Sequence, residues 1–211
     1  MNLEKRNAVV TRILAGDGLY IFDKINKMSY TCTAGFWARS KQNINYIATA
    51  GHCYVPASGP FYLYPWNSTS VSLIGEMNAY LLEPIDFGLI SINNTNIQPI
   101  PCVRNSDSEQ YKELFIADVI SVSNNGAHLC LSGLYSHVRC GYVAALNGFF
   151  SYGEFFFDNI FVANLRYITG DSGGPIFYHK NLTHVSLNGI LMGGLFDFND
   201  NTRVLMVLLE L

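Results

Sequence analysis

Charged residues are scarce in this chain, and long uninterrupted apolar runs are missing. Lysine, arginine, aspartate and glutamate make up 14% of the 211 residues, against 49% for the hydrophobic types. Such a composition excludes an intrinsically disordered chain and favours a compact globule. No apolar run reaches the roughly 18 residues that a membrane-spanning helix requires. The net charge of −3 gives no reason to expect a nucleic-acid partner.

Cysteine is also uncommon, and five residues are too few for a small scaffold held together mainly by disulfides. None of them stands in a CxxC pair, so a zinc or redox site has little support and no metal is expected. The spacing suggests two pairs, Cys32 with Cys53 and Cys130 with Cys140, and leaves Cys102 over.

The first twelve residues, MNLEKRNAVVTR, carry charges and lack the apolar stretch of a signal peptide. We expect residues 1–12 to be a residual pro-segment or leader, cleaved near Arg12, with a signal and pro-segment upstream. Three Asn-x-Ser/Thr sequons, which are glycosylation acceptors in secreted proteins, begin at Asn67, Asn93 and Asn181. Together with the cysteine pairs they favour an oxidising, extracellular destination.

Short apolar runs separated by glycine, asparagine and serine recur along the chain, a pattern typical of strands and turns. The expected strands are Leu19–Phe22, Tyr30–Trp37, Ile44–Ala48, Phe61–Tyr64, Val71–Ile74, Phe87–Ile92, Leu114–Val122, Cys140–Ala145, Phe155–Val162, Gly174–Tyr178, Ser186–Met192 and Thr202–Leu209. Residues 204–211 are equally compatible with a terminal helix. This spacing predicts an all-β protein, either a sandwich or a pair of barrels, with residues 105–110 connecting its halves.

The hexapeptide Gly170–Pro175, GDSGGP, is the strongest chemical signal in the chain. A nucleophilic serine needs a tight turn that exposes its Oγ and aims nearby backbone N–H groups at the reacting carbonyl. Glycines permit the backbone angles of such a turn and leave room for a substrate. The alternative interpretation is an ordinary glycine-rich β-turn. We predict that Ser172 is a nucleophile.

Two further segments supply the partners of such a serine: TAGHC, which contains His52, and DFGLI, which begins at Asp86. Histidine has an unperturbed pKa near neutrality, so it can take a proton from serine and return it to a leaving amine. A carboxylate beside an apolar strand is costly unless it is hydrogen-bonded, and an imidazole N–H is a natural partner. Taken singly, the histidine would be structural and the aspartate a strand cap. The order His52, Asp86, Ser172 makes a catalytic triad the better interpretation.

In this order and context the chain resembles the trypsin/chymotrypsin-type serine proteases, and among them the streptogrisin and α-lytic protease branch. The segments that carry the resemblance are ILAGDGLY at 13–20, CTAGF at 32–36, TAGHC at 49–53, CLSG at 130–133, CGYV at 140–143 and GILMGG at 189–194. It covers Ile13 to about Leu209. The resemblance implies two antiparallel six-stranded β-barrels, residues 13–104 and 105–211, with the active site in the cleft between them.

The same resemblance implies the disulfides Cys32–Cys53 and Cys130–Cys140. It also implies an oxyanion hole formed by the N–H groups of Gly170 and Ser172. Attack of Ser172 on a peptide carbonyl would give an acyl-enzyme that water hydrolyses, without a metal or cofactor. The residues that we assign to substrate binding are Ile168, Thr169, Met192, Gly193, Gly194 and Phe196.

Three positions depart from the family pattern. Leu131 stands where many relatives carry an arginine that pairs with the aspartate before the nucleophile, so Asp171 needs another partner, for which Arg139 is a candidate. Met192 replaces a serine that would hydrogen-bond to Asp86. Arg166 falls near the base of the primary pocket: pointing inward it would favour acidic substrates, and pointing outward, which we favour, it would be a solvated surface residue beside an apolar pocket.

We therefore predict a secreted, monomeric serine endopeptidase that acts on polypeptides and is restrained by a pro-segment or protein inhibitor, with no nucleic-acid or membrane partner. One alternative is a catalytically silent binding module on the same fold, because fold does not determine function. Another is an intracellular or viral processing protease, which would account for the missing signal peptide but fits the cysteine pairs less well.

Overall fold

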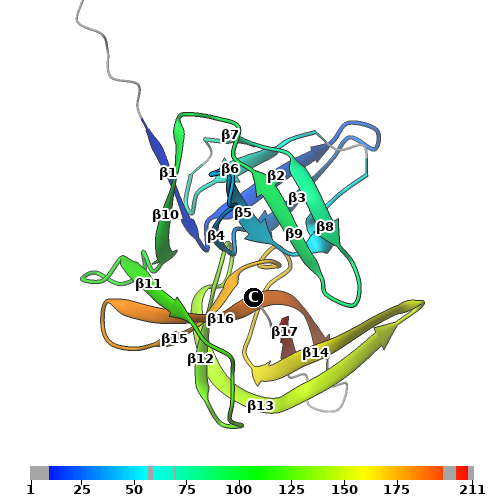
Figure 1. Ribbon diagram of the computed structural model, residues 1–211, viewed down its shortest axis with the longest axis vertical. Helices are drawn as coiled ribbons and strands as arrows, with labels where there is room; N and C mark the ends of the chain where they lie inside the picture. Colours follow the sequence, from blue (N-terminus) through cyan, green and yellow to red (C-terminus); the bar gives the residue numbers. More distant parts are fainter. Residues whose placement is uncertain (1–9, 57–58, 69, 197–202, 209–211) are drawn as a thin grey trace, which may run out of the picture.

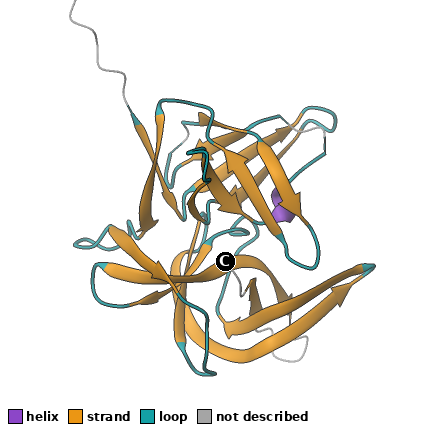
Figure 2. Ribbon diagram, viewed as in Figure 1, coloured by secondary structure: helices purple, strands orange, loops and turns teal. Residues whose placement is uncertain are grey.

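The computed structural model describes residues 10–56, 59–68, 70–196 and 203–208. Over these ranges the chain forms seventeen β-strands and one short 3-10 helix, η1 (Gly51–Cys53), drawn in purple in Figure 2. In Figure 1 the strands gather into two parts, with β2 to β9 above and β12 to β17 below. The predicted all-β class is confirmed.

Residues 18–91 form two four-stranded antiparallel sheets that face one apolar core. The first has the order β3 (Met28–Thr33), β2 (Gly18–Asp23), β6 (Phe61–Tyr64) and β7 (Ser72–Gly75). The second has the order β4 (Phe36–Arg39), β5 (Asn45–Thr49), β9 (Phe87–Ser91) and β8 (Met77–Leu81). Because successive strand residues point to opposite faces, alternate side chains reach the core, among them Leu19, Ile21, Leu63, Ile74 and Ile90.

A nine-stranded sheet holds the remaining strands. Its order is β1 (Thr11–Ala15), β10 (Ile97–Arg104), β11 (Glu113–Val119), β16 (His184–Phe196), β15 (Pro175–His179), β12 (His128–Gly133), β13 (His137–Tyr152), β14 (Phe155–Asn164) and β17 (Arg203–Leu208). Since β17 also pairs with β16, the six strands from β16 to β17 close into a ring. Apolar side chains such as Leu131, Phe161 and Leu191 fill its core.

This closed ring has the strand number that the family resemblance implies for the second barrel. The first half of the chain is different, because its two sheets of four strands share a core without joining into one hydrogen-bonded ring among the residues described. The strand count of the first barrel therefore stays a prediction.

Strands β1, β8, β10 and β12 lie outside the predicted set. β10 contains Pro99 and Pro101, which cannot donate to a ladder, and it forms because β1 pairs with its start in parallel and β11 with its end. Thr11 and Arg12, placed in the expected leader, begin β1, and Arg12 forms an ion pair with Glu113. At the other end, residues 203–208 form a strand rather than a helix.

The hairpin of β13 and β14 projects beyond the rest of the lower part in Figure 1. Phenylalanines crowd its end, and Phe149, Phe155 and Phe156 are exposed, with relative accessibilities of 75%, 43% and 48%. Exposed aromatic groups in such number are unusual for a protein surface and commonly mark a binding site.

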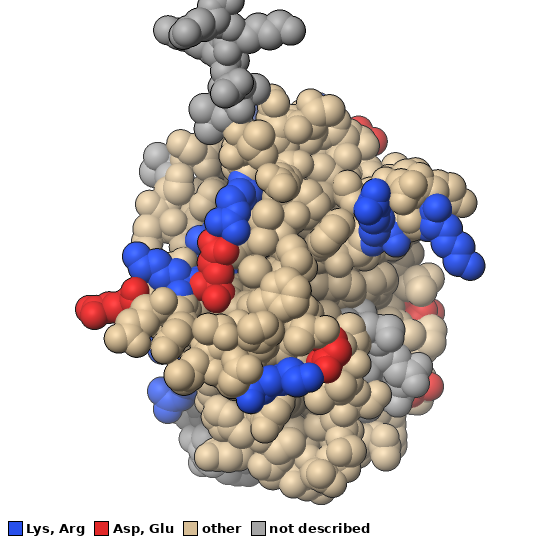
Figure 3. Space-filling model, turned by 60° about the vertical axis from the view of Figure 1, so that its left-hand side comes forward, with Lys and Arg blue, Asp and Glu red and all other residues tan. Residues whose placement is uncertain are grey.

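Charged side chains are few on the face shown in Figure 3, and several basic ones lie beside acidic ones. They carry no continuous basic surface there of the kind that binds nucleic acid. In the portion of the chain that the structure describes, no helix is long and apolar enough to cross a membrane.

Candidate active site

His52 lies in the middle of η1, directly after β5. A Cβ atom at Gly51 would stand 2.0 Å from the carbonyl oxygen of Leu81, so only glycine lets this turn approach the end of β8 so closely. The disulfide between Cys32 and Cys53 ties the same turn to β3, with the two Cα atoms 6.2 Å apart. The histidine is therefore held by backbone packing on one side and a covalent bond on the other.

Asp86 is buried immediately before β9, and both of its carboxylate oxygens contact His52. Oδ1 accepts a hydrogen bond from the backbone N–H of His52 at 2.8 Å, and Oδ2 lies 2.5 Å from Nδ1 of the ring. The side chain of the aspartate is 4% exposed and that of the histidine 43%. A carboxylate accepting from Nδ1 places the proton there and leaves Nε2 as an acceptor toward solvent. Among the described residues, Nε2 has no partner.

Ser172 occupies a turn whose conformation requires glycine on both sides. The φ angles of Gly170 and Gly173 are 105° and 84°, in the left-handed region that side chains with a Cβ avoid. Where the chain is described, no acceptor is found for the amides of Gly170 and Ser172. Two backbone donors at one turn, both without internal partners, are the arrangement that an oxyanion hole needs.

Asp171 supports this turn from beneath, although not in the way that the sequence suggests. Its fully buried carboxylate accepts three backbone hydrogen bonds, from Tyr135 at 2.8 Å, Ser136 at 3.1 Å and Ile168 at 2.7 Å. Arg139 is exposed and is not among its partners, so the candidate arginine is wrong. Two backbone amides of the β12–β13 turn, together with the amide of Ile168, take the place of the missing family arginine, because N–H donors can satisfy the oxygens of a buried carboxylate.

The serine turn packs directly against the histidine turn. The backbone N–H of Thr33 donates to the carbonyl of Ser172 at 2.8 Å, and the Thr33 hydroxyl donates to the carbonyl of Gly170 at 2.9 Å. A Cβ at Gly173 would lie 2.0 Å from Oγ1 of Thr49, three residues before His52. Sγ of Cys53 is 4.0 Å from the carbonyl oxygen of Ser172. The structure thus places the backbone of Ser172 beside the turn that carries His52, which in turn contacts Asp86.

A cavity of about 380 Å³ opens beside His52 and Asp86. Met192, Gly193 and Gly194, three of the residues assigned to substrate binding, line it from β16. The buried side chain of Met192, 8% exposed, stands where a serine is expected and packs with Ile160 rather than binding the aspartate.

Two of the other predicted substrate-binding residues lie away from this cavity. Ile168 and Thr169 are exposed and do not line this cavity, and the same is true of Arg166. The backbone of Phe196 ends β16, and its side chain is outside the described part of the structure.

Four apolar residues complete the cavity wall and were not foreseen: Leu82, Phe150, Phe155 and Phe157. The three phenylalanines come from the end of the β13–β14 hairpin. The unusual run FFSYGEFFF at 149–157 was the available signal, but it gave no indication that the hairpin folds toward the histidine.

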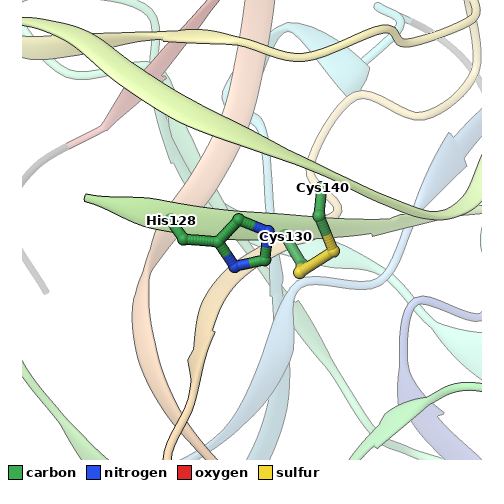
Figure 4. A group of neighbouring side chains, drawn as sticks. All are labelled: His128, Cys130 and Cys140. Carbon is green, nitrogen blue, oxygen red and sulfur yellow. A yellow bond between two sulfur atoms is a disulfide. The ribbon is translucent and has the colours of Figure 1, made fainter. Parts of the chain in front are cut away.

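The second disulfide joins Cys130 and Cys140, which face each other across β12 and β13. His128 lies beside it in Figure 4, and the ligand atoms of the three residues are within 4.8 Å of one another. Because the two sulfurs are bonded to each other, only the imidazole of this group offers a free donor atom. Cys102 is half-buried on β10 and is not disulfide-bonded.

No family sequence model matches the chain, and no curated protein matches it by sequence. Solved structures do. Protease A of Thermobifida fusca superposes with a TM-score of 0.71 at 20% identity, covering 94% of this chain and 92% of that one. A glutamic acid specific serine protease, which uses a histidine triad in substrate binding, gives 0.72 at 21% identity and 93% of both chains.

An α-lytic protease homologue, N4, gives a TM-score of 0.69 at 18% identity, over 94% of this chain and 93% of that chain. All three matches extend over nearly the whole length of both partners, so they concern the complete architecture and not one motif. The chain has the fold of the trypsin/chymotrypsin-type serine proteases, including the α-lytic branch.

Proposed function

We propose that this chain is a serine endopeptidase, with Ser172 as nucleophile, His52 as general base and Asp86 as the residue that orients the histidine. One observation carries the proposal. A buried carboxylate holds the histidine through Nδ1, and the turn that packs against it presents Ser172 with two amides that have no internal acceptor. A fold kept only for binding would not need that combination.

In the proposed reaction Ser172 Oγ attacks the carbonyl carbon of a peptide bond while Nε2 of His52 takes the hydroxyl proton. The oxyanion that forms accepts hydrogen bonds from the amides of Gly170 and Ser172. Such donors are typically worth about 3–4 kcal/mol each in the transition state. His52 then gives its proton to the leaving amine, and an acyl-enzyme remains on Ser172. Water, deprotonated by His52, releases the acid product and restores the serine.

Asp86 has a defined part in this cycle. Its Oδ2 holds the tautomer with the proton on Nδ1, and the negative charge stabilises the imidazolium that forms during attack. Its Oδ1 accepts from the histidine backbone, so the two residues move as one unit. The serine that would normally add a further bond is absent, and Met192 contributes packing instead.

We also propose that the enzyme works outside the cell on polypeptide substrates. Two disulfides persist only where the surroundings are oxidising, and their presence supports this location. The same cysteines disfavour an intracellular processing protease, in which the four thiols would stay reduced. The alternative to be tested is that the chain is a catalytically silent binding module on the same fold.

The test is hydrolysis of casein and of a fluorogenic peptide library by the wild-type chain and by Ser172→Ala. We expect cleavage by the wild type and a loss of at least about 10⁴-fold in kcat/KM for the variant. Ser123→Ala, which changes an exposed serine away from the cavity, is the matched control and should retain full activity. A folded wild-type chain that cleaves nothing would support the silent module.

A further inference from the structure

The side chain of Tyr167 lies against the backbone of β16 near the end of that strand. A Cβ atom at Gly194 would lie 2.2 Å from Cε1 of Tyr167 and 2.8 Å from its Cζ, so the tyrosine ring rests against the glycine backbone. Tyr167 is half-buried and packs onto the apolar core that contains Leu129, Val143 and Leu191. The ring therefore bridges the segment before Ser172 and the end of β16.

Gly193, the preceding residue, has the opposite surroundings. A Cβ there would meet no atom within 4 Å. Since successive residues of a strand point to opposite faces, one side of β16 is closed by Tyr167 and the other is open. Both glycines line the cavity beside His52, which is the room available to a substrate lying along this strand.

That room is shaped for a large apolar group. Its volume of about 380 Å³ is within the usual range of ligand sites, and its wall away from the triad consists of Leu82, Met192 and three phenylalanines. The rings of Phe150 and Phe157 stack with centroids 6.0 Å apart, and both pack against Met192 and Ile160. Among the lining residues that the structure describes, Asp86 and His52 are the ionisable ones, and they are paired with each other.

We propose that this aromatic-lined cavity, and not the space beside Ile168 and Thr169, selects the substrate. The preferred substrate is an extended polypeptide with a bulky aromatic or aliphatic side chain shortly before the residue whose carbonyl is attacked, and a small side chain at that residue itself. This inference rests on the proposed function.

The direction from which Ser172 would attack supports both the small side chain at the cleaved bond and the bulky side chain before it. A carbonyl oxygen held by the amides of Gly170 and Ser172 would put its own residue next to the segment 167–169, where the Tyr167 ring lies against Gly194 and takes up room that a substrate side chain could otherwise use. The preceding residues run along Gly193 and Gly194 and bring a side chain into the cavity. Binding energy gained there, away from the reacting bond, can be used to position the carbonyl for attack.

The experiment uses fluorogenic peptides that vary one position at a time. We expect the wild type to prefer glycine, alanine or serine at the residue that supplies the carbonyl, and phenylalanine or leucine over alanine at one of the preceding positions. That second preference should be roughly tenfold to a hundredfold, the effect of burying one large apolar side chain.

Neighbouring residues of β14 offer a matched pair of variants. Phe155→Ala removes a ring that lines the cavity, so it should lower kcat/KM for the phenylalanine and leucine peptides several-fold more than for the alanine peptide and erase most of the preference for a bulky preceding residue. Phe156→Ala removes an equally exposed ring that instead stacks on Phe149 and does not line the cavity, so it should leave the preference intact. Equal effects of the two variants would overturn the assignment of the cavity.

Tyr167→Ala tests the closed side, and it should raise kcat/KM for peptides with a large residue at the cleaved bond by roughly tenfold or more. A wild type that already prefers large residues there would refute this part.

Binding to Ser172→Ala separates the inference from the proposed function. A tighter complex with a phenylalanine peptide than with its alanine counterpart, lost in Phe155→Ala/Ser172→Ala, supports the cavity even if no hydrolysis is seen. Equal binding of the two peptides contradicts it.

Discussion

The polar framework behind the proposed triad and the aromatic lining of the cavity beside His52 are held by different interactions. The framework, called the polar wall below, is buried: Asp86 is 3% exposed, and Thr33, Thr49 and Asp171 are not exposed at all. Each of these groups has defined hydrogen-bond partners. The aromatic wall of the cavity consists of phenylalanine rings on the β13–β14 hairpin. These rings contact one another with centroids 6.0–6.5 Å apart.

The difference has a physical consequence. A buried polar group that loses its hydrogen-bond partner costs about 1–3 kcal/mol of stability, so the positions of the groups in the polar wall are closely specified. Aromatic packing depends mainly on area and volume and tolerates exchange of one apolar side chain for another. We therefore expect substitutions in the polar wall to change catalysis or stability, and substitutions in the aromatic wall to change the choice of substrate.

The sharpest way to break the polar wall is Asp86→Asn, which keeps the shape and removes the charge. The amide would present an N–H where Nδ1 needs an acceptor, so the histidine would adopt the wrong tautomer. We expect kcat to fall by about 10⁴-fold with the fold retained, measured by peptide hydrolysis and circular dichroism.

Asp107→Asn is the control for that variant, because Asp107 also contacts a histidine, His137, at 2.8 Å, but on the surface away from the cavity. It should leave kcat unchanged. A small effect of Asp86→Asn, or a large one of Asp107→Asn, would mean that the His52–Asp86 contact is not the catalytic one.

Asp171→Asn tests the support of the serine turn. An amide has one acceptor oxygen instead of two, so at least one backbone N–H among its three partners is left without an acceptor. We expect the free energy of unfolding to drop by about 1–3 kcal/mol in urea titrations. Arg139→Ala should change it by less than about 0.5 kcal/mol, as an exposed substitution does. If the arginine variant is the more damaging, the family-like pairing with Asp171 must exist in solution.

The smallest effect concerns the thiol chemistry. The denatured, unreduced chain should contain one reactive thiol, Cys102, and five would contradict both disulfides. Burial, reinforced by the nearby charge of Glu113, raises the pKa of the Cys102 thiol above its ordinary value. The native chain should therefore react with iodoacetamide more slowly than free cysteine at pH 8, and faster as the pH rises, because only the thiolate is nucleophilic. A native rate equal to that of free cysteine would contradict this burial.

The sequence predicts the polar wall well because its signals are local. The glycines around Ser172 are required by φ angles within the same six residues, and the cysteine at position 53 is adjacent to His52. Most strands were predictable for the same reason, since alternation and turn residues are read over a few positions. His52 and Asp86 are in contact, and the backbone of Ser172 lies beside the turn that carries His52; the triad itself stays a prediction.

The features that the sequence did not predict depend on contacts between segments far apart in the chain. Phe155 and Phe157 follow His52 by roughly a hundred residues. They approach it only because the β13–β14 hairpin curves toward the histidine, and no local sequence pattern predicts that curvature. Likewise, Tyr167 covers Gly194, and the amides of Tyr135 and Ser136 replace an arginine, only because the closed ring of strands brings them together. Strand β10 was not predicted because its two prolines disfavour a strand locally. It forms because it pairs with β1 and β11.

Labelling with a fluorophosphonate probe, followed by mass spectrometry of the modified peptide, tests the central proposal most directly. The reagent reacts with a serine whose proton is removed by a base and whose oxyanion is stabilised, so it requires Ser172, His52 and the two amides together. We predict a single adduct on Ser172 in the wild-type chain, and none in His52→Ala or Ser172→Ala. A folded wild-type chain that remains unlabelled, or one labelled equally well without His52, would contradict the account.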